Sequence, residues 1–183
     1  GKTTVARIMS KVFRTLGILS RGHLVEADRS KLVAGFSEQT AIKTNQLVDS
    51  AIGGVLFIDE AYTLASSEHD SFGSEAIDTL LKRLEDDRGK FVCIVAGYRM
   101  EMDNLFRINP GFKSRFNYFL NIDDYTPDEL FKIMLTFAED KKYLFAPKAE
   151  DKTVMVIRDL YEHRDKNFAN GRAMRQLFDQ ICK

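Results

Sequence analysis

The sequence predicts an α/β fold with a mainly parallel sheet, followed by a small part built only from helices. Residues 55–59 (VLFID) and 91–97 (FVCIVAG) are continuous apolar runs of strand length, which are typical of strands covered on both faces. Amphipathic patterns with helical spacing alternate with these strands. After Tyr125 only helical patterns remain. We therefore divide the chain into an α/β part, residues 1–125, and a helical part, residues 126–183.

The other elements of the first part follow from apolar spacing and from the glycines that end each pattern. We predict helices over residues 3–16, 40–50 and 74–87, a short strand over 22–27 and a mixed one over 117–123. Ser74 is the expected N-cap of the third helix. In the predicted sheet, the acids after residue 58 lie at the carboxyl end of a strand.

The second part begins with the sequence TPDEL. Thr126 is placed as an N-cap, Pro127 suits the first helical position, and Glu129 completes a capping box. We predict helices over residues 127–142, 150–164 and 170–182.

Composition bounds the function. The 183 residues are 44% hydrophobic and carry 27 basic and 27 acidic side chains, a balance that argues against a nucleic-acid or membrane-surface binder. Cys93 and Cys182 lack metal-ligand spacing and fit a reducing compartment. No apolar run is long enough to cross a bilayer. We expect a cytoplasmic protein without a membrane partner.

The first four residues, GKTT, match the end of the phosphate-binding pattern G-x-x-x-x-G-K-[ST]-[ST]. In that loop a helix N-terminus holds phosphate, the lysine reaches the β/γ oxygens, and the hydroxyl binds Mg²⁺. Gly1, Lys2, Thr3 and Thr4 are thus candidate nucleotide ligands, with Thr3 at the metal. Taken alone, so short a match is equally compatible with a chance helix start.

The strand ending in Asp59 and Glu60 makes the match far more specific. Open α/β sheets bind ligands at the carboxyl ends of their strands. Asp59 is expected to hold Mg²⁺, directly or through water, and Glu60 to orient and deprotonate the attacking water. A buried strand that merely reaches solvent at two acids is the competing interpretation.

Five segments in order, VLFIDEAYTLA, AIDTLLKRLED, VAGYR, NPGFKSRF and FANGRAMRQLF, resemble AAA+ ATPases of the CbxX/CfqX type. That group includes red-type rubisco activases, the stage V sporulation protein K family and the cytosolic ATPases of type VII secretion. The resemblance implies a P-loop NTPase three-layer sandwich followed by an all-α lid. It implies that ATP and Mg²⁺ are the cofactors. It also implies that the chain starts after the first, central strand of the sheet.

The resemblance assigns further roles. Phe36 aligns with the aromatic residue of the pore loop that grips a polypeptide. Tyr98 stands where a sensor, usually Asn, contacts the γ-phosphate or the attacking water; a phenol can donate the same hydrogen bond. Arg115 takes the place of the arginine finger that reaches a neighbouring subunit, with Arg107 and Lys113 as rivals.

In the helical part, Arg172 is the expected second sensor, which closes the lid onto the nucleotide; Arg175 is the alternative. The leading function is an ATPase ring, usually a hexamer, that remodels a protein substrate. A nucleic-acid-handling module of the helicase-loader type and an inactive fragment with an assembly role are the alternatives. Without the upstream strand we expect these residues alone to bind ATP poorly.

Overall fold

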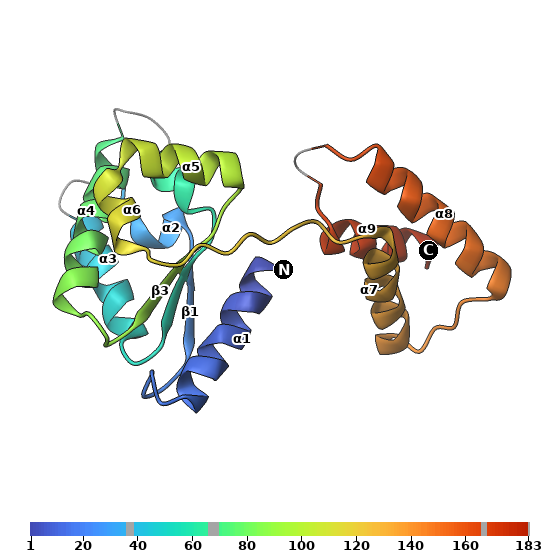
Figure 1. The fold of residues 1–183 in the computed structure, drawn as a ribbon, viewed down its shortest axis with the longest axis horizontal. Helices are drawn as coiled ribbons and strands as arrows, with labels where there is room; N and C mark the ends of the chain where they lie inside the picture. Colours follow the sequence, from blue (N-terminus) through green and yellow to red (C-terminus); the bar gives the residue numbers. More distant parts are fainter. Residues whose placement is uncertain (36–38, 66–69, 166–167, 183) are drawn as a thin grey trace. The chain divides into compact units, whose positions relative to one another are not determined.

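The structure, a computed structural model, describes residues 1–35, 39–65, 70–165 and 168–182. Contacts divide the chain into two compact units, Gly1–Leu120 and Asn121–Lys183 (Figure 1). The first unit is α/β and the second is helical, as predicted. The boundary between residues 125 and 126 stays a prediction for the limits of independently folding domains. No helix in the described parts of the chain is long and apolar enough to cross a bilayer.

Within the described residues, the sheet of the first unit has three parallel strands in the order β1-β2-β3. These are β1 (Leu24–Ala27), β2 (Val55–Ile58) and β3 (Val92–Val95). The central position of β2 explains its unbroken apolar sequence, because all four of its residues are at most 2% exposed. β3 was expected to be fully buried over residues 91–97, and this was wrong: its residues are only partly buried. Among the described strands β3 pairs on one side alone.

Seven helical segments complete the first unit within the described residues. They are α1 (Lys2–Thr15), α2 (Arg29–Leu32), α3 (Gln39–Ala51), the 3₁₀ turn η1 (Ala61–Ala65), α4 (Ser71–Asp86), α5 (Arg99–Ile108) and α6 (Pro110–Arg115). Figure 1 shows α3 and α4 on one face of the sheet and α1 on the other. The three helices predicted for this part are confirmed. However, α4 starts before Ser74, because Asp70 accepts a hydrogen bond from the Gly73 amide and is the N-cap.

The core of the first unit lies between β2 and the helices on the α3–α4 side. Leu56 and Ile58 of β2 pack with apolar residues from these helices and from the segments that follow β3. The core residues that the helical segments contribute are nearly inaccessible to solvent and include Leu32, Val48, Leu64, Ile77, Leu80, Leu105 and Phe112. Burial of this apolar surface is the main stabilising contribution to the unit.

The predicted strand over residues 117–123 is wrong. These residues have no strand assignment, and Tyr118, Phe119, Leu120 and Ile122 are each at least half exposed. Apolar alternation favours a strand only where a neighbouring edge supplies hydrogen bonds. In the described residues none of these four forms a backbone hydrogen bond with β3.

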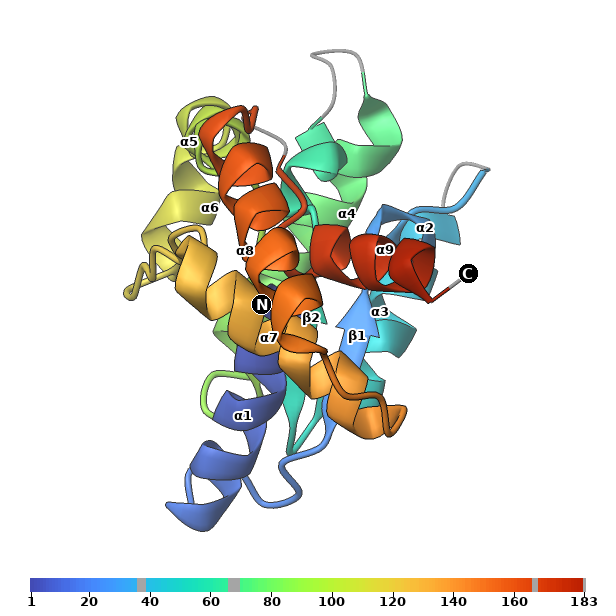
Figure 2. The same cartoon turned by 90° about the vertical axis from the view of Figure 1, so that its right-hand side faces the viewer.

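The second unit contains α7 (Pro127–Asp140), α8 (Pro147–Glu162) and α9 (Gly171–Ile181). Helices α8 and α9 both pack on α7 (Figure 2). Their core consists of Leu130, Met134, Ala138, Ile157, Met174 and Phe178. The predicted capping box is confirmed, since Thr126 accepts from the Glu129 amide and Glu129 accepts from the Thr126 amide.

Candidate functional site

The start of α1 and the end of β2 meet at one place. The Lys2 ammonium lies 3.6 Å from a carboxylate oxygen of Asp59, and both side chains are about one-third exposed. Lys2 reaches this position because it is the first residue of α1, while Asp59 directly follows β2. The two residues that the sequence analysis placed around one ligand are thus neighbours in space. Their chemical roles stay predictions.

The backbone fixes the two successive acids. The Asp59 amide donates to Ala27 O at 2.8 Å, which extends the β1–β2 pairing beyond the strands. Glu60 has φ +51°, in the left-handed region that residues other than glycine rarely adopt. Its carbonyl then accepts from both the amide and the hydroxyl of Thr63, at 2.9 and 2.8 Å. This turn starts η1 and sets the two carboxylates on a tight bend.

The first turn of α1 fits a phosphate. Gly1 occupies the N-cap without a side-chain hydrogen bond, and the turn contains no acidic residue. The amide groups at a helix N-terminus carry partial positive charge and favour an anion. Thr3 is half-buried and Thr4 is exposed in this same turn. In nucleotide sites Mg²⁺ is bound by carboxylate, hydroxyl and phosphate oxygens. The residues present therefore fit both a phosphate group and a magnesium ion.

Tyr98 contributes its ring to this site. The Lys2 ammonium lies 4.9 Å from the ring centroid of Tyr98, within the range of a cation–π contact. The Tyr62 and Tyr98 rings are tilted neighbours, 6.3 Å between centroids. Burial raises the pKa of Tyr62, and the nearby Glu60 carboxylate raises it further. Tyr62 was not among the predicted site residues. Its place in the turn after Asp59 was the only available signal.

Gly97 explains how these aromatic rings pack. A Cβ atom at this position would lie 2.7 Å from the sulfur of Met102 and 2.8 Å from a ring carbon of Tyr62. Any side chain would therefore displace Tyr62 or Met102. The glycine that precedes Tyr98 thus permits close packing between η1 and α5.

Arg115 ends α6 and forms an ion pair with Glu85 of α4 at 2.5 Å. Of its rivals, Arg107 donates to Asn104 at 2.8 Å, and Lys113 is exposed. Among the described residues, Arg115 makes no hydrogen bond or ion pair with Lys2 or Asp59. This arrangement is compatible with a residue that acts on another subunit, and the role of arginine finger stays a prediction.

The two candidates for the second sensor lie in the second unit. Arg172 is exposed near the start of α9. The Arg175 guanidinium lies 4.5 Å from the ring centroid of Phe137, so that side chain already packs within the unit. Phe36, the predicted pore-loop residue, lies outside the described residues.

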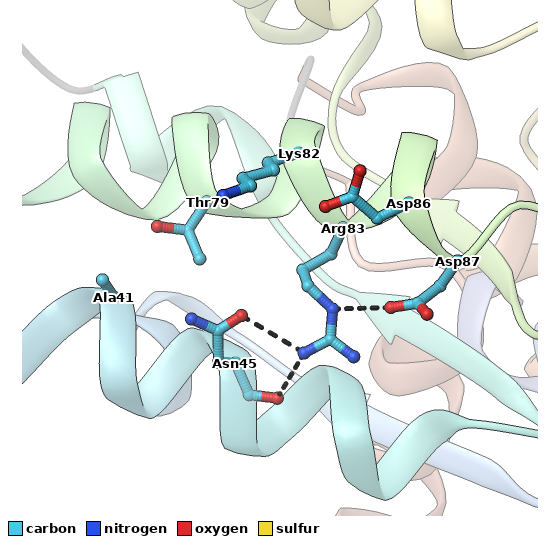
Figure 3. Close-up of a pocket in the computed structure, with 7 residues that line it drawn as sticks. All are labelled: Ala41, Asn45, Thr79, Lys82, Arg83, Asp86 and Asp87. Atoms are coloured by element: carbon cyan, nitrogen blue, oxygen red, sulfur yellow. Dashed lines mark hydrogen bonds and ion pairs between the residues drawn. The ribbon is translucent and has the colours of Figure 1, made fainter.

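A hollow of about 570 Å³ lies elsewhere, between α3 and α4 (Figure 3). Arg83 occupies its wall and bonds to Asn45, Asp49 and Asp87. Burial opposes the charge of Arg83, but the hydrogen bonds to Asp49 and Asp87 prevail and raise its pKa. The guanidinium is therefore fully engaged within the protein. We interpret this hollow as a gap beside the Arg83 contacts that connect α3 with α4, and not as the nucleotide site.

Comparisons with known proteins agree with this arrangement. The model of the ATPase family associated with various cellular activities (AAA) matches residues 1–124, and the AAA lid domain matches residues 126–183. Stage V sporulation protein K of Bacillus subtilis is 40% identical over 100% of this chain and 57% of its own length. Protein CfxQ of Xanthobacter flavus is 42% identical over 99% of this chain and 57% of its own.

A third relative is the chloroplastic ribulose bisphosphate carboxylase/oxygenase activase of Cyanidioschyzon merolae. It is 40% identical over 98% of this chain and 61% of its own length. The chain thus spans a little over half the length of these relatives. The parallel sheet of an α/β core, followed by a helical lid, matches the fold of a P-loop NTPase. The chain belongs to the AAA family of ATPases, CbxX/CfqX type, with an α/β core followed by a lid.

Proposed function

We propose that the full-length protein is a magnesium-dependent ATPase that remodels a protein substrate. The observation that carries the proposal is the convergence of the Lys2 ammonium and the Asp59 carboxylate, 3.6 Å apart, at a helix N-terminus whose N-cap is Gly1. A cation, an anion-binding helix end and a carboxylate at one sheet edge are the parts that phosphoryl transfer from ATP requires. Membership of an ATPase family supports the same reaction.

Each residue then has a physical task. The amides of the first turn of α1 and the Lys2 ammonium bind phosphate oxygens. Thr3 and Asp59 hold Mg²⁺, which neutralises charge on the phosphates when bound. Glu60 orients the attacking water and accepts its proton. Its carbonyl is anchored by Thr63, so the backbone that carries the carboxylate is fixed before substrate arrives.

Three further roles belong to residues outside this cluster. We propose that Arg115 leaves Glu85 to act on a neighbouring subunit in a ring, that Arg172 reports nucleotide state through the lid, and that Phe36 contacts the substrate polypeptide. The hexamer, the cytoplasmic location and the protein substrate rest on family resemblance. One relative is named as an activase of ribulose bisphosphate carboxylase/oxygenase, which is itself a protein target.

Replacing Glu60 by Gln in the full-length protein tests the central assignment. Gln keeps the size of the side chain but cannot accept a proton, so ATP should bind within about twofold of wild type while turnover falls by about 10²–10⁴-fold. Glu101→Gln is the matched control, because Glu101 lies in the first turn of α5 near Tyr62 but has no proposed part in catalysis. Normal hydrolysis by the Glu60 variant would refute the assignment.

A further inference from the structure

We propose that Tyr98 is a positioning residue that holds the Lys2 ammonium with the face of its ring, and so sets ATP affinity. The inference rests on the proposed function. It replaces the sensor role expected for Tyr98, in which the hydroxyl contacts the γ-phosphate or the attacking water. Under this proposal, two partners, the Asp59 carboxylate and the Tyr98 ring, both attract the Lys2 ammonium and keep it available for phosphate.

The two contacts of Lys2 differ in kind. The 3.6 Å separation from Asp59 is longer than the 2.7–2.9 Å of a charge-assisted hydrogen bond, so the carboxylate attracts the ammonium without clamping it. The ring of Tyr98 lies 4.9 Å from the same nitrogen and attracts it through the π face. Under the proposal, the attraction of the ammonium to the ring competes with its attraction to Asp59.

The ring of Tyr98 is itself held in place. The backbone carbonyl of Tyr98 accepts a hydrogen bond from the Met102 amide at 2.9 Å, which fixes Tyr98 as the N-cap of α5. Tyr62 packs beside the ring, in space that only Gly97 leaves open. By contrast, the Tyr98 hydroxyl has no hydrogen-bond partner among the described residues, and the side chain is 43% exposed. The neighbouring structure thus orients the ring and not the hydroxyl.

A consequence follows for nucleotide binding. If the ring is lost, Lys2 is free to close onto Asp59 as a tight ion pair. That pair occupies both the group that binds phosphate and the oxygen proposed for Mg²⁺. ATP must then break it, so its affinity falls. The chemical step at bound ATP does not use the ring, so kcat at saturating ATP is retained.

The experiment compares Tyr98→Phe and Tyr98→Leu in the full-length protein, with far-UV circular dichroism to verify folding. Phe keeps the ring and loses the hydroxyl, so ATP affinity and kcat should stay within twofold of wild type. Leu removes the ring, so the Kd for ATP should rise about two- to fivefold, the factor expected for a cation–π contact at a half-exposed site, with kcat within twofold. A tenfold loss of kcat in the Phe variant, or an unchanged Kd in the Leu variant, overturns the inference.

A second measurement does not depend on hydrolysis. Ring currents should shift the NMR signals of the Lys2 ε-methylene upfield in wild type and in Tyr98→Phe, and the shift should vanish in Tyr98→Leu. Absence of the shift in wild type overturns the inference even if the protein hydrolyses ATP. A shift of the expected size in a protein that binds no ATP overturns the proposed function instead.

Discussion

Replacing Arg83 by Ala should measure how strongly α3 is joined to α4. The Arg83 side chain is 17% exposed and pairs with Asp87, 14% exposed, at 2.6 Å and with the more exposed Asp49 at 2.7 Å. It also donates to Asn45 at 3.2 Å. Lys90 still neutralises Asp87 in the variant, at 2.9 Å, so the loss stays below that of an orphaned buried charge.

We therefore expect the variant to lose about 2 kcal/mol of unfolding free energy, within the range of about 1.5–3 kcal/mol for a hydrogen bond to a charged group. In a unit of this size that loss lowers Tm by roughly 6–10 °C. The assay is urea and thermal unfolding followed by circular dichroism, with hydrogen exchange to locate the change in α3 and α4. Lys82→Ala is the matched control, because Lys82 lines the same hollow on the adjacent position of α4 but is exposed.

The pH dependence gives an independent check. Hydrogen bonds from Lys90, and then from Arg83, lower the pKa of Asp87 below its ordinary 3.8. A lowered folded-state pKa stabilises the protein above the unfolded value and loses that contribution as the pH falls through the folded one. The difference between wild type and Arg83→Ala should thus be full above about pH 5 and shrink below pH 4. If the unfolding free energies of Arg83→Ala and Lys82→Ala agree within about 0.5 kcal/mol at pH 7, the Arg83 contacts do not hold α3 and α4 together.

Two further predictions concern the core and the second unit. Desolvation raises the pKa of the Cys93 thiol to about 12, although this residue is only partly buried, so in native protein a thiol reagent at pH 8 should modify the exposed Cys182 first; equally rapid modification of both thiols would contradict the raised pKa. Thr126→Ala removes one half of the capping box with Glu129 and should cost about 1 kcal/mol in urea unfolding. Thr136→Ala, on the exposed surface of the same helix, is its control, and equal stability of the two variants would count against the cap.

The sequence was most informative where one physical demand dominated. The run at residues 55–59 predicted a strand covered on both faces, and the side chains of residues 55–58 are all buried. Alternation at residues 117–123 carried no information about a pairing partner, and that prediction failed. α5 and α6 were missed because Asn109 and Pro110 break the pattern into two short helices, and α5 has a tyrosine in place of a usual N-cap.

The candidate site shows the same division. The proximity of Lys2 and Asp59 was predictable, since helix starts and strand ends meet at one edge of a parallel sheet. The contact of Lys2 with the ring of Tyr98 was not, because it depends on side-chain rotamers and on packing against Tyr62. Glu85 was likewise unforeseen as the partner of Arg115, because the two residues are distant in sequence.

The left-handed backbone at Glu60 has a consequence for how this acid is understood. Glycine adopts that conformation freely, whereas a residue with a Cβ loses about 1 kcal/mol or more there. Glycine in place of Glu60 would therefore favour folding at this bend. A glutamate at this position lowers the stability of the fold. Its presence is most simply explained if the protein needs the charge for something other than stability.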